Sequence, residues 1–284
     1  METKIYKQVN VPNLDYTKLK VILIGVSKYP DDQVSDVPNI KANVNLLKRT
    51  LTNSSNFGVP SENIFVSLNK TTNEIINDLT SFVCETENDD TILVYYSGHG
   101  FISDYNSKLY LSTTDSNLDD IESTSISIER FVEIISLSNS NQKIVILDSC
   151  YSGHIHNLFN NPESSIYGLD KSENLYVISS SSGDEPSYYP LNSKNSPTYF
   201  TGELIKVLQN GIENGKSYIT LNQVYTSVKT SLKNQDLPSP QRTYNGNRIV
   251  ITRNNSVVEE FENVPNSLVN IFTSIAVFVT SFSK

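Results

Sequence analysis

Short runs of apolar residues alternate along the chain with segments of helical periodicity. The runs are uniformly apolar, which is typical of strands buried on both faces of a parallel sheet. Strands and helices that alternate in this way predict an α/β fold with a mostly parallel sheet covered on both faces. The expected strands are 21–26, 63–68, 91–96, 108–112, 143–147, 174–179 and 248–252, and the expected helices are 40–51, one opening after Thr71, 128–137, 200–210 and 221–232.

The helix after Thr71 has a clear sequence signal at its start. Thr71 and Glu74 have the spacing of a capping box, in which each side chain bonds to the backbone N–H of the other residue. Cys84 falls at the end of the same helix. We expect Cys84 to pack as a small hydrophobic residue, because free cysteines are usually buried.

Two of the apolar runs end in residues that carry reactive chemistry. The run 91–96 is followed by Ser-Gly-His-Gly, which contains His99, and the run 143–147 by Asp-Ser-Cys, which contains Cys150. Open α/β sheets place their binding crevices at the carboxyl ends of the strands, so His99 and Cys150 are expected to meet there. A thiol attacks a carbonyl as its thiolate and needs a nearby base. The pair therefore predicts acyl transfer, with the Gly100 and Cys150 amides stabilising the oxyanion.

The composition and net charge argue against several classes of protein. The 284 residues carry a net charge of −9 without a basic block, which argues against a nucleic-acid-binding protein. Two distant cysteines, Cys84 and Cys150, do not form a disulfide framework or a zinc motif. Residues 1–20 lack the apolar core of a signal peptide, so a reducing cytoplasm is the expected location. His154 and His156 lie in the long polar segment 151–173 and are expected to be loop residues rather than bases.

Residues 20–254 resemble the caspase–metacaspase superfamily of cysteine peptidases, and more narrowly the bacterial caspase-like domains of conflict and antiphage systems. The most specific matches are YYSGHG around His99 and DSCYSG around Cys150. The supporting matches are VILIGVSKYPD, ANVNLLKRTL, LYVISSSSGDE, TYFTGELIKVL and PSPQRTYNGNRIVITRN, in family order. The resemblance implies a three-layer α/β/α sandwich with a mostly parallel six-stranded central sheet. It leaves residues 1–19 as an N-terminal extension and 255–284 as a hydrophobic C-terminal tail, which is uncharged over 263–283.

The resemblance also assigns roles to individual residues. His99 matches the catalytic histidine and Cys150 the nucleophile, with Gly100 and the Cys150 amide as the oxyanion hole. Asp148 matches the acidic residue of the S1 pocket in metacaspases, and the loop with Asp31 also feeds that pocket. A carboxylate pocket implies cleavage after basic residues, Arg before Lys. Many metacaspases have Asp where this chain has Asn43. The pocket of this chain then lacks one carboxylate, and its preference for basic residues is expected to be weaker.

The implied function is a cytoplasmic cysteine endopeptidase acting on protein substrates, as a signal-gated effector in antiphage defence or regulated cell death. No cofactor is required by the sequence, and the expected activator acts in trans, either a sensor protein or a nucleotide second messenger. Some metacaspases need calcium, but no ligand loop of the required spacing is present here. Self-cleavage near Lys171 is a weaker expectation. The alternative from another functional class is a catalytically silent caspase-fold binding or scaffold module.

Two further features of the sequence bear on the class of protein. A nucleotide-binding α/β protein is disfavoured because the chain has neither GxGxxG nor a P-loop. The segment 263–283 is uncharged, and its dense apolar part is shorter than the roughly 20 residues that a membrane span needs. We expect this segment to dock onto the domain, and the alternatives are self-association and, least favoured, membrane contact.

Overall fold

The structure is a computed structural model, and it describes residues 14–160, 175–182, 188–190, 193, 195–213, 215–245 and 249–256. The segment 263–283 and Lys171 lie outside these residues, so the expectations about them concern parts that the structure does not describe. No helix in the described part is long and apolar enough to cross a membrane.

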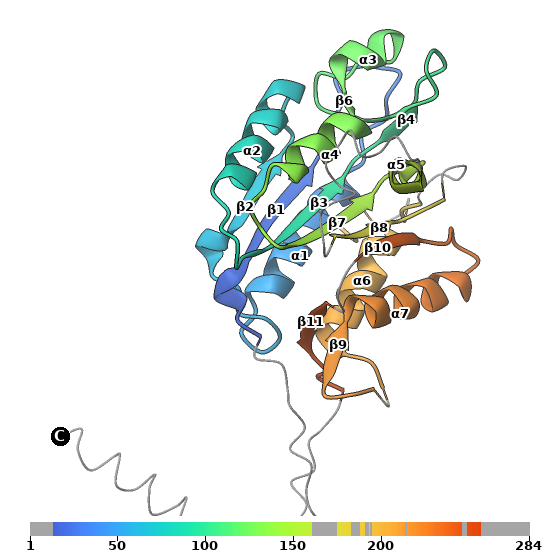
Figure 1. Ribbon diagram of the computed structural model, residues 1–284. Coiled ribbons are helices and arrows are strands. Elements are labelled where there is room, and N and C mark those ends of the chain that lie inside the picture. Colours follow the sequence, from blue (N-terminus) through green and yellow to red (C-terminus); the bar gives the residue numbers. More distant parts are fainter. Residues whose placement is uncertain are drawn as a thin grey trace, which may run out of the picture.

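A six-stranded sheet forms the centre of the molecule (Figure 1), in the order β10-β8-β7-β3-β1-β2. Five strands run parallel, and β10 at one edge runs antiparallel to β8. This sheet confirms the expected α/β class. The strands are β1 (Leu19–Gly25), β2 (Ile64–Leu68), β3 (Thr91–Ser97), β7 (Gln142–Asp148), β8 (Leu175–Ser179) and β10 (Gln241–Asn245).

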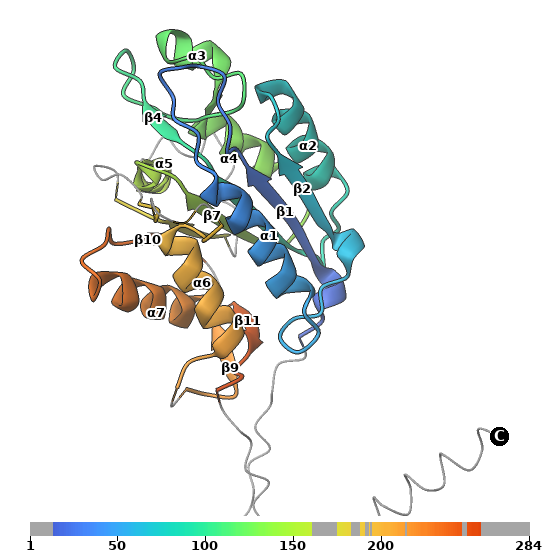
Figure 2. The same ribbon diagram turned by 180° about the vertical axis from the view of Figure 1, so that it is seen from behind.

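Helices cover both faces of the sheet and complete the three layers (Figures 1 and 2). One face is covered by α1 (Asn39–Thr52), α6 (Tyr199–Asn210) and α7 (Leu221–Lys233). The other face is covered by α2 (Thr72–Cys84) and α4 (Ile128–Ser136). The capping box predicted for Thr71 and Glu74 is present at the start of α2.

The central strands are uniformly apolar because each one supplies two cores. In β1, Val21 and Leu23 belong to the core under α1, whereas Ile22 and Ile24 belong to the core under α2. Successive side chains of a strand point to opposite faces, so a sheet covered on both faces needs apolar residues at every position.

The remaining elements are short and lie around this sandwich. A three-stranded sheet contains β4 (Gly100–Ile102), β5 (Leu109–Leu111) and β6 (Ile126–Ser127), and β9 (Tyr218–Thr220) pairs with β11 (Val250–Arg253). Short helices are η1 (Tyr16–Lys18), η2 (Ser61–Asn63), η3 (Leu118–Asp120), α3 (Ile121–Thr124), η4 (Ser152–His154) and α5 (Ile155–Asn160). The strands expected at 108–112 and 248–252 therefore exist, but outside the central sheet.

Three expectations were incomplete or wrong. The sixth strand, β10, was not predicted, because its sequence Gln-Arg-Thr-Tyr-Asn is polar, as suits the edge of a sheet. Cys84 is exposed rather than packed, because the buried stripe of α2 runs through Ile75, Leu79 and Val83, which turns the next residue toward solvent. The segment after Cys150 begins with η4 and α5 rather than a loop, which gives His154 and His156 defined positions.

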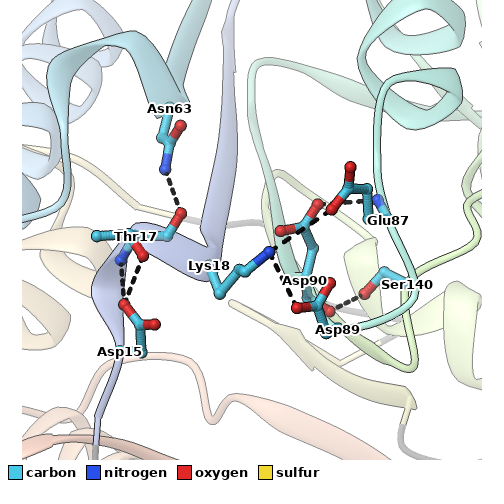
Figure 3. A network of polar contacts seen from close by, with 8 residues as sticks. All are labelled: Asp15, Thr17, Lys18, Asn63, Glu87, Asp89, Asp90 and Ser140. Atoms are coloured by element: carbon cyan, nitrogen blue, oxygen red, sulfur yellow. Dashed lines mark hydrogen bonds and ion pairs between the residues drawn. The ribbon is translucent and has the colours of Figure 1, made fainter.

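Polar contacts tie the chain together at the amino ends of the central strands (Figure 3). The Lys18 ammonium lies 2.9 Å from the Asp89 carboxylate and 3.5 Å from that of Glu87. The Ser140 hydroxyl donates to the Asp90 carbonyl at 2.6 Å. These contacts connect the segments that lead into β1, β3 and β7, at the end opposite the residues singled out by the sequence.

Candidate active site

The strand register brings the two reactive residues to one edge of the sheet. Gly25 pairs with Ser97, and Ser97 pairs with Asp148, at the carboxyl ends of β1, β3 and β7. His99 lies two residues after Ser97, and Cys150 lies two residues after Asp148. Both line one pocket of about 50 Å³, here called the His99–Cys150 pocket.

His99 is half-buried, and its ring is held in place by several neighbours. Its Nε2 lies 2.8 Å from the Ser35 carbonyl oxygen. Because a carbonyl only accepts hydrogen bonds, Nε2 carries the proton in the neutral ring, which leaves Nδ1 as the basic atom. The ring also lies against Tyr29 and Phe101, with centroid distances of 4.8 and 5.6 Å. Burial lowers the pKa of His99 below its ordinary value, and the bond to Ser35 opposes this shift.

The backbone of His99 is fixed by a buried hydroxyl network. The His99 N–H donates to the Tyr29 hydroxyl at 3.0 Å, and the His99 carbonyl accepts from Ser112 at 2.9 Å and Tyr96 at 3.0 Å. Burial raises the pKa of both tyrosines far enough to keep them protonated. Sequence reasoning missed these three residues, because Tyr96 reads as one more apolar strand position and the others carry no local signal.

Gly100 is required by its close approach to the cysteine turn. A Cβ at this position would lie 2.4 Å from the Cys150 carbonyl oxygen and 3.3 Å from the Ser149 hydroxyl. A contact of 2.4 Å is far inside van der Waals distance, so only glycine allows β4 to start there without a shift. The residues proposed as oxyanion donors, Gly100 and Cys150, are thus packed backbone against backbone.

Cys150 lies two residues beyond Asp148, the last residue of β7. Tyr151 has a φ of 56°, in the left-handed region that non-glycine residues rarely adopt. The carbonyl of Ser149, the residue before Cys150, accepts hydrogen bonds from the hydroxyls of Ser180 at 3.2 Å and Ser181 at 3.4 Å. The turn that presents the thiol is therefore anchored to the segment after β8. The Ser149 hydroxyl itself is buried and has no hydrogen-bond partner among the residues that the structure describes.

Asp148 lies in the wall of the His99–Cys150 pocket and is 3% exposed. Its Oδ2 accepts hydrogen bonds from the hydroxyls of Thr198 and Thr201, the second at 2.6 Å. The Asn43 amide donates to the same oxygen at 3.2 Å and to the Ser97 hydroxyl at 3.0 Å. Sequence reasoning had singled out Asp148 and Asn43, but not the two threonines.

Asp31 lies apart from this group. Its carboxylate accepts from the backbone N–H groups of Gln33 at 2.9 Å and Leu118 at 3.2 Å. It lines a different cavity, together with Asp115 and Asp119. The structure thus brings His99, Gly100, Asp148 and Cys150 together and leaves Asp31 in a turn that faces η3.

His156, which we had expected in a loop, is buried between two strands of the sheet. Its Nδ1 lies 2.6 Å from the Thr243 hydroxyl on β10, and its Nε2 lies 3.0 Å from the Ser179 hydroxyl on β8. Burial lowers the pKa of His156 to about 4, so the ring is neutral near pH 7. It does not line the His99–Cys150 pocket. Within the described ranges, no group of three or more His, Cys, Asp and Glu side chains is arranged to hold a metal ion.

Comparisons with known proteins agree with the fold. The fold is similar to that of caspase-1 from Spodoptera frugiperda, with a TM-score of 0.59 and 12% identity over 82% of this chain and 89% of that one. It is also similar to a protein of Geobacter sulfurreducens, with a TM-score of 0.55 and 13% identity over 81% of this chain and 94% of that one. No curated protein sequence matches the chain. The family model of the caspase domain, peptidase C14, matches residues 18–262, and the chain therefore belongs to the caspase-domain family of peptidases.

Proposed function

We propose that this chain is a cysteine endopeptidase that cleaves polypeptides after basic residues, Arg before Lys, with His99 and Cys150 as its catalytic dyad. One observation carries the proposal. His99 and Cys150 line the same pocket, while the Ser35 carbonyl engages Nε2 and leaves Nδ1 as the base. The alternative scaffold role is less well supported, because a scaffold needs neither the thiol nor an oriented imidazole.

The reaction follows from these groups. Nδ1 of His99 takes the thiol proton of Cys150, and the thiolate attacks the scissile carbonyl carbon. The Gly100 and Cys150 amides stabilise the oxyanion, and the imidazolium then protonates the leaving amine. A thioester remains on Cys150. His99 removes a proton from water, which attacks the thioester and releases the acid, and the proton returns to the thiolate. The Ser35 carbonyl accepts from the ring throughout, so no carboxylate is needed as a third member.

The preference for basic residues rests on Asp148. A carboxylate in the pocket wall pairs with a guanidinium through charge-assisted hydrogen bonds. Thr198, Thr201 and Asn43 donate hydrogen bonds to this carboxylate and hold it in the pocket wall. The pocket of about 50 Å³ is small beside the roughly 300–1,000 Å³ of typical ligand sites. This supports a gated enzyme in which the walls, including Tyr188 and Tyr189, move apart as the substrate enters.

The biological role that we propose is a cytoplasmic, signal-gated effector in bacterial antiphage defence or regulated cell death. It rests on the resemblance of the YYSGHG and DSCYSG motifs to bacterial caspase-like domains. The substrates are proteins, and the activator is a partner protein or a nucleotide signal that acts in trans.

The test uses peptidyl electrophiles that differ only in P1 residue, with intact-protein mass spectrometry as the readout. We expect the Arg probe, and more slowly the Lys probe, to modify Cys150, with no modification by the Asp probe or of Cys150→Ala. Equal reaction with all probes would refute basic selection. Absence of reaction at Cys150 under all conditions, while its thiol still reacts with iodoacetamide, would favour the scaffold role. A fluorogenic P1 peptide library measures cleavage directly with the same variant as control.

A further inference from the structure

A cavity of about 530 Å³ lies on the outer face of α1, in the size range of small-molecule sites. We name it the α1 cavity. Lys41, Asn45 and Arg49 are spaced four residues apart, so they form one stripe along the helix. Lys28, from the loop after β1, and Asn195, from the segment before α6, complete its polar lining.

The charge of the α1 cavity is opposite to that of the protein. The chain has a net charge of −9, yet three of the four charged residues at the cavity are cations. In the part of the chain that the structure describes, none of these three cations forms an ion pair. Asp36 is the one carboxylate in the described lining, and its Oδ1 accepts the Tyr29 N–H at 2.9 Å. Ion pairs are instead made by Lys18, Lys70, Lys108, Arg130 and Lys206.

Solvated lysines on a helix face are common, and by themselves they indicate no ligand. Here the cations come from two separate elements and surround a cavity whose wall also contains Pro38, Ala42 and Leu46. Phosphate is the anion that suits this set, because a guanidinium binds it through two hydrogen bonds and lysines add charge. The apolar residues provide contact for the rest of a small organic molecule. We propose that the α1 cavity binds a phosphate-bearing small molecule.

The α1 cavity shares a wall with the His99–Cys150 pocket. Asp36 and Pro38 line the α1 cavity. Ser35, beside Asp36, bonds to His99 through its carbonyl oxygen. Val37, between Asp36 and Pro38, lines the His99–Cys150 pocket. Asn39, in the first turn of α1, is the next residue along this wall.

A second segment continues the wall. The Asn39 amide donates to the carbonyls of Ser193 at 2.8 Å and Ser196 at 2.9 Å. Asn195 lines the α1 cavity, and Thr198 bonds to Asp148 in the pocket. A bound phosphate ligand restrains both segments and thereby changes the setting of His99 and Asp148. This regulatory effect rests on the proposed peptidase function, whereas binding itself does not.

Binding is tested by thermal unfolding of the full chain at low salt, with pyrophosphate, ADP, ATP and AMP as probes. A ligand of the native state raises the Tm. We expect at least one probe to raise the Tm of the wild-type protein and of Lys48→Glu, but not that of Arg49→Glu. The two variants change the charge of α1 equally, and Lys48 does not line the α1 cavity. A shift with pyrophosphate assigns the site to the phosphate alone, and a shift with nucleotides only assigns it to a nucleotide. No shift with any probe, or a shift retained in Arg49→Glu, would overturn the proposal.

Coupling to the pocket is tested by the rate of iodoacetamide alkylation of Cys150, resolved by peptide mass spectrometry. The exposed Cys84 serves as the internal reference. We expect the bound probe to change the Cys150 rate at least about twofold without changing the Cys84 rate, because the thiolate fraction depends on His99. An unchanged ratio would refute the coupling. This readout needs no peptidase activity, so its failure is distinct from failure of the proposed function.

Discussion

Ser97 and Asp148 are register partners at the carboxyl ends of β3 and β7. This one pairing sets the geometry of the site, because His99 and Cys150 each follow two residues later. Asn43 lies under the pair and donates to both side chains. The positions of His99 and Cys150 and the acidic wall of the pocket therefore depend on the same pair of strands, and disturbing the register would displace all of them.

Replacement of Gly100 by alanine is expected to displace the cysteine turn. The new Cβ would meet the Cys150 carbonyl oxygen at 2.4 Å, and neither backbone can yield without moving. We expect reaction of Cys150 with the Arg probe to fall at least about tenfold, because misplacement of about 1 Å costs that much or more. Gly202→Ala in α6 is the control, since the nearest atom to its Cβ among the described residues outside its own helix belongs to the Pro197 side chain, at 3.3 Å. Equal rates for the two variants would contradict the close approach described for Gly100.

Replacement of Asn43 by aspartate is expected to lower the stability at pH 7. The amide nitrogen lies 3.2 Å from Asp148 Oδ2, so the variant brings two buried carboxylates together at a cost on the order of 3 kcal/mol. One carboxyl then has a raised pKa in the folded state, so the folded state binds more protons and the deficit shrinks as the pH falls. Urea unfolding at pH 7 and pH 5 measures this, with Asn45→Asp on the exposed side of α1 as control. A deficit independent of pH would argue against the charge repulsion.

His99 is expected to titrate below the ordinary histidine value of about 6.5. Burial disfavours its charged form, and the Ser35 carbonyl compensates only in part. The neutral base therefore persists to lower pH, and the acid limb of kcat/KM should lie below pH 6.5. The Cys150→Ala variant removes coupling to the thiol, so an NMR titration of its His99 ring reports the imidazole alone. A midpoint at or above pH 7 would contradict the role that we assign to burial.

His156 is expected to make the fold sensitive to acid. Its pKa is lowered to about 4 in the folded state, against about 6.5 for an unfolded chain. Between these values the unfolded state binds more protons. His156 therefore contributes on the order of 3 kcal/mol to the free energy of unfolding above about pH 6.5. This contribution is lost as the pH falls toward 4. Urea unfolding from pH 7 to pH 4.5 should show a shallower decline for His156→Gln than for the wild-type protein. Parallel declines would refute the assignment.

Patterns in the amino-acid sequence were enough to predict the layers of the fold and to propose the pair of reactive residues. Strands buried on both faces need apolar side chains at every position, so β1, β3 and β7 appear as uniform runs without any tertiary information. Because parallel strands end at a common edge, His99 and Cys150 could be placed together from their positions alone. The edge strand β10 and the exposure of Cys84 could not be predicted in this way. The polar sequence of β10 could equally belong to a loop, and a cysteine at the end of a helix can be either buried or exposed.

The groups that surround His99 and Cys150 could be identified from the folded structure but not from the sequence. The Ser35 carbonyl that fixes the tautomer of His99 comes from 64 positions earlier in the chain. The Thr201 hydroxyl, which donates to Asp148, lies 53 positions later in the chain. The Thr243 hydroxyl, which contacts His156, lies 87 positions after it. Asp31, close to Ser35 in sequence, turns instead toward Leu118. These partners are hydroxyls and backbone carbonyls, which occur throughout any chain and carry no local pattern. Packing of the helices and loops against the sheet selects among them, and that selection is a property of the whole fold.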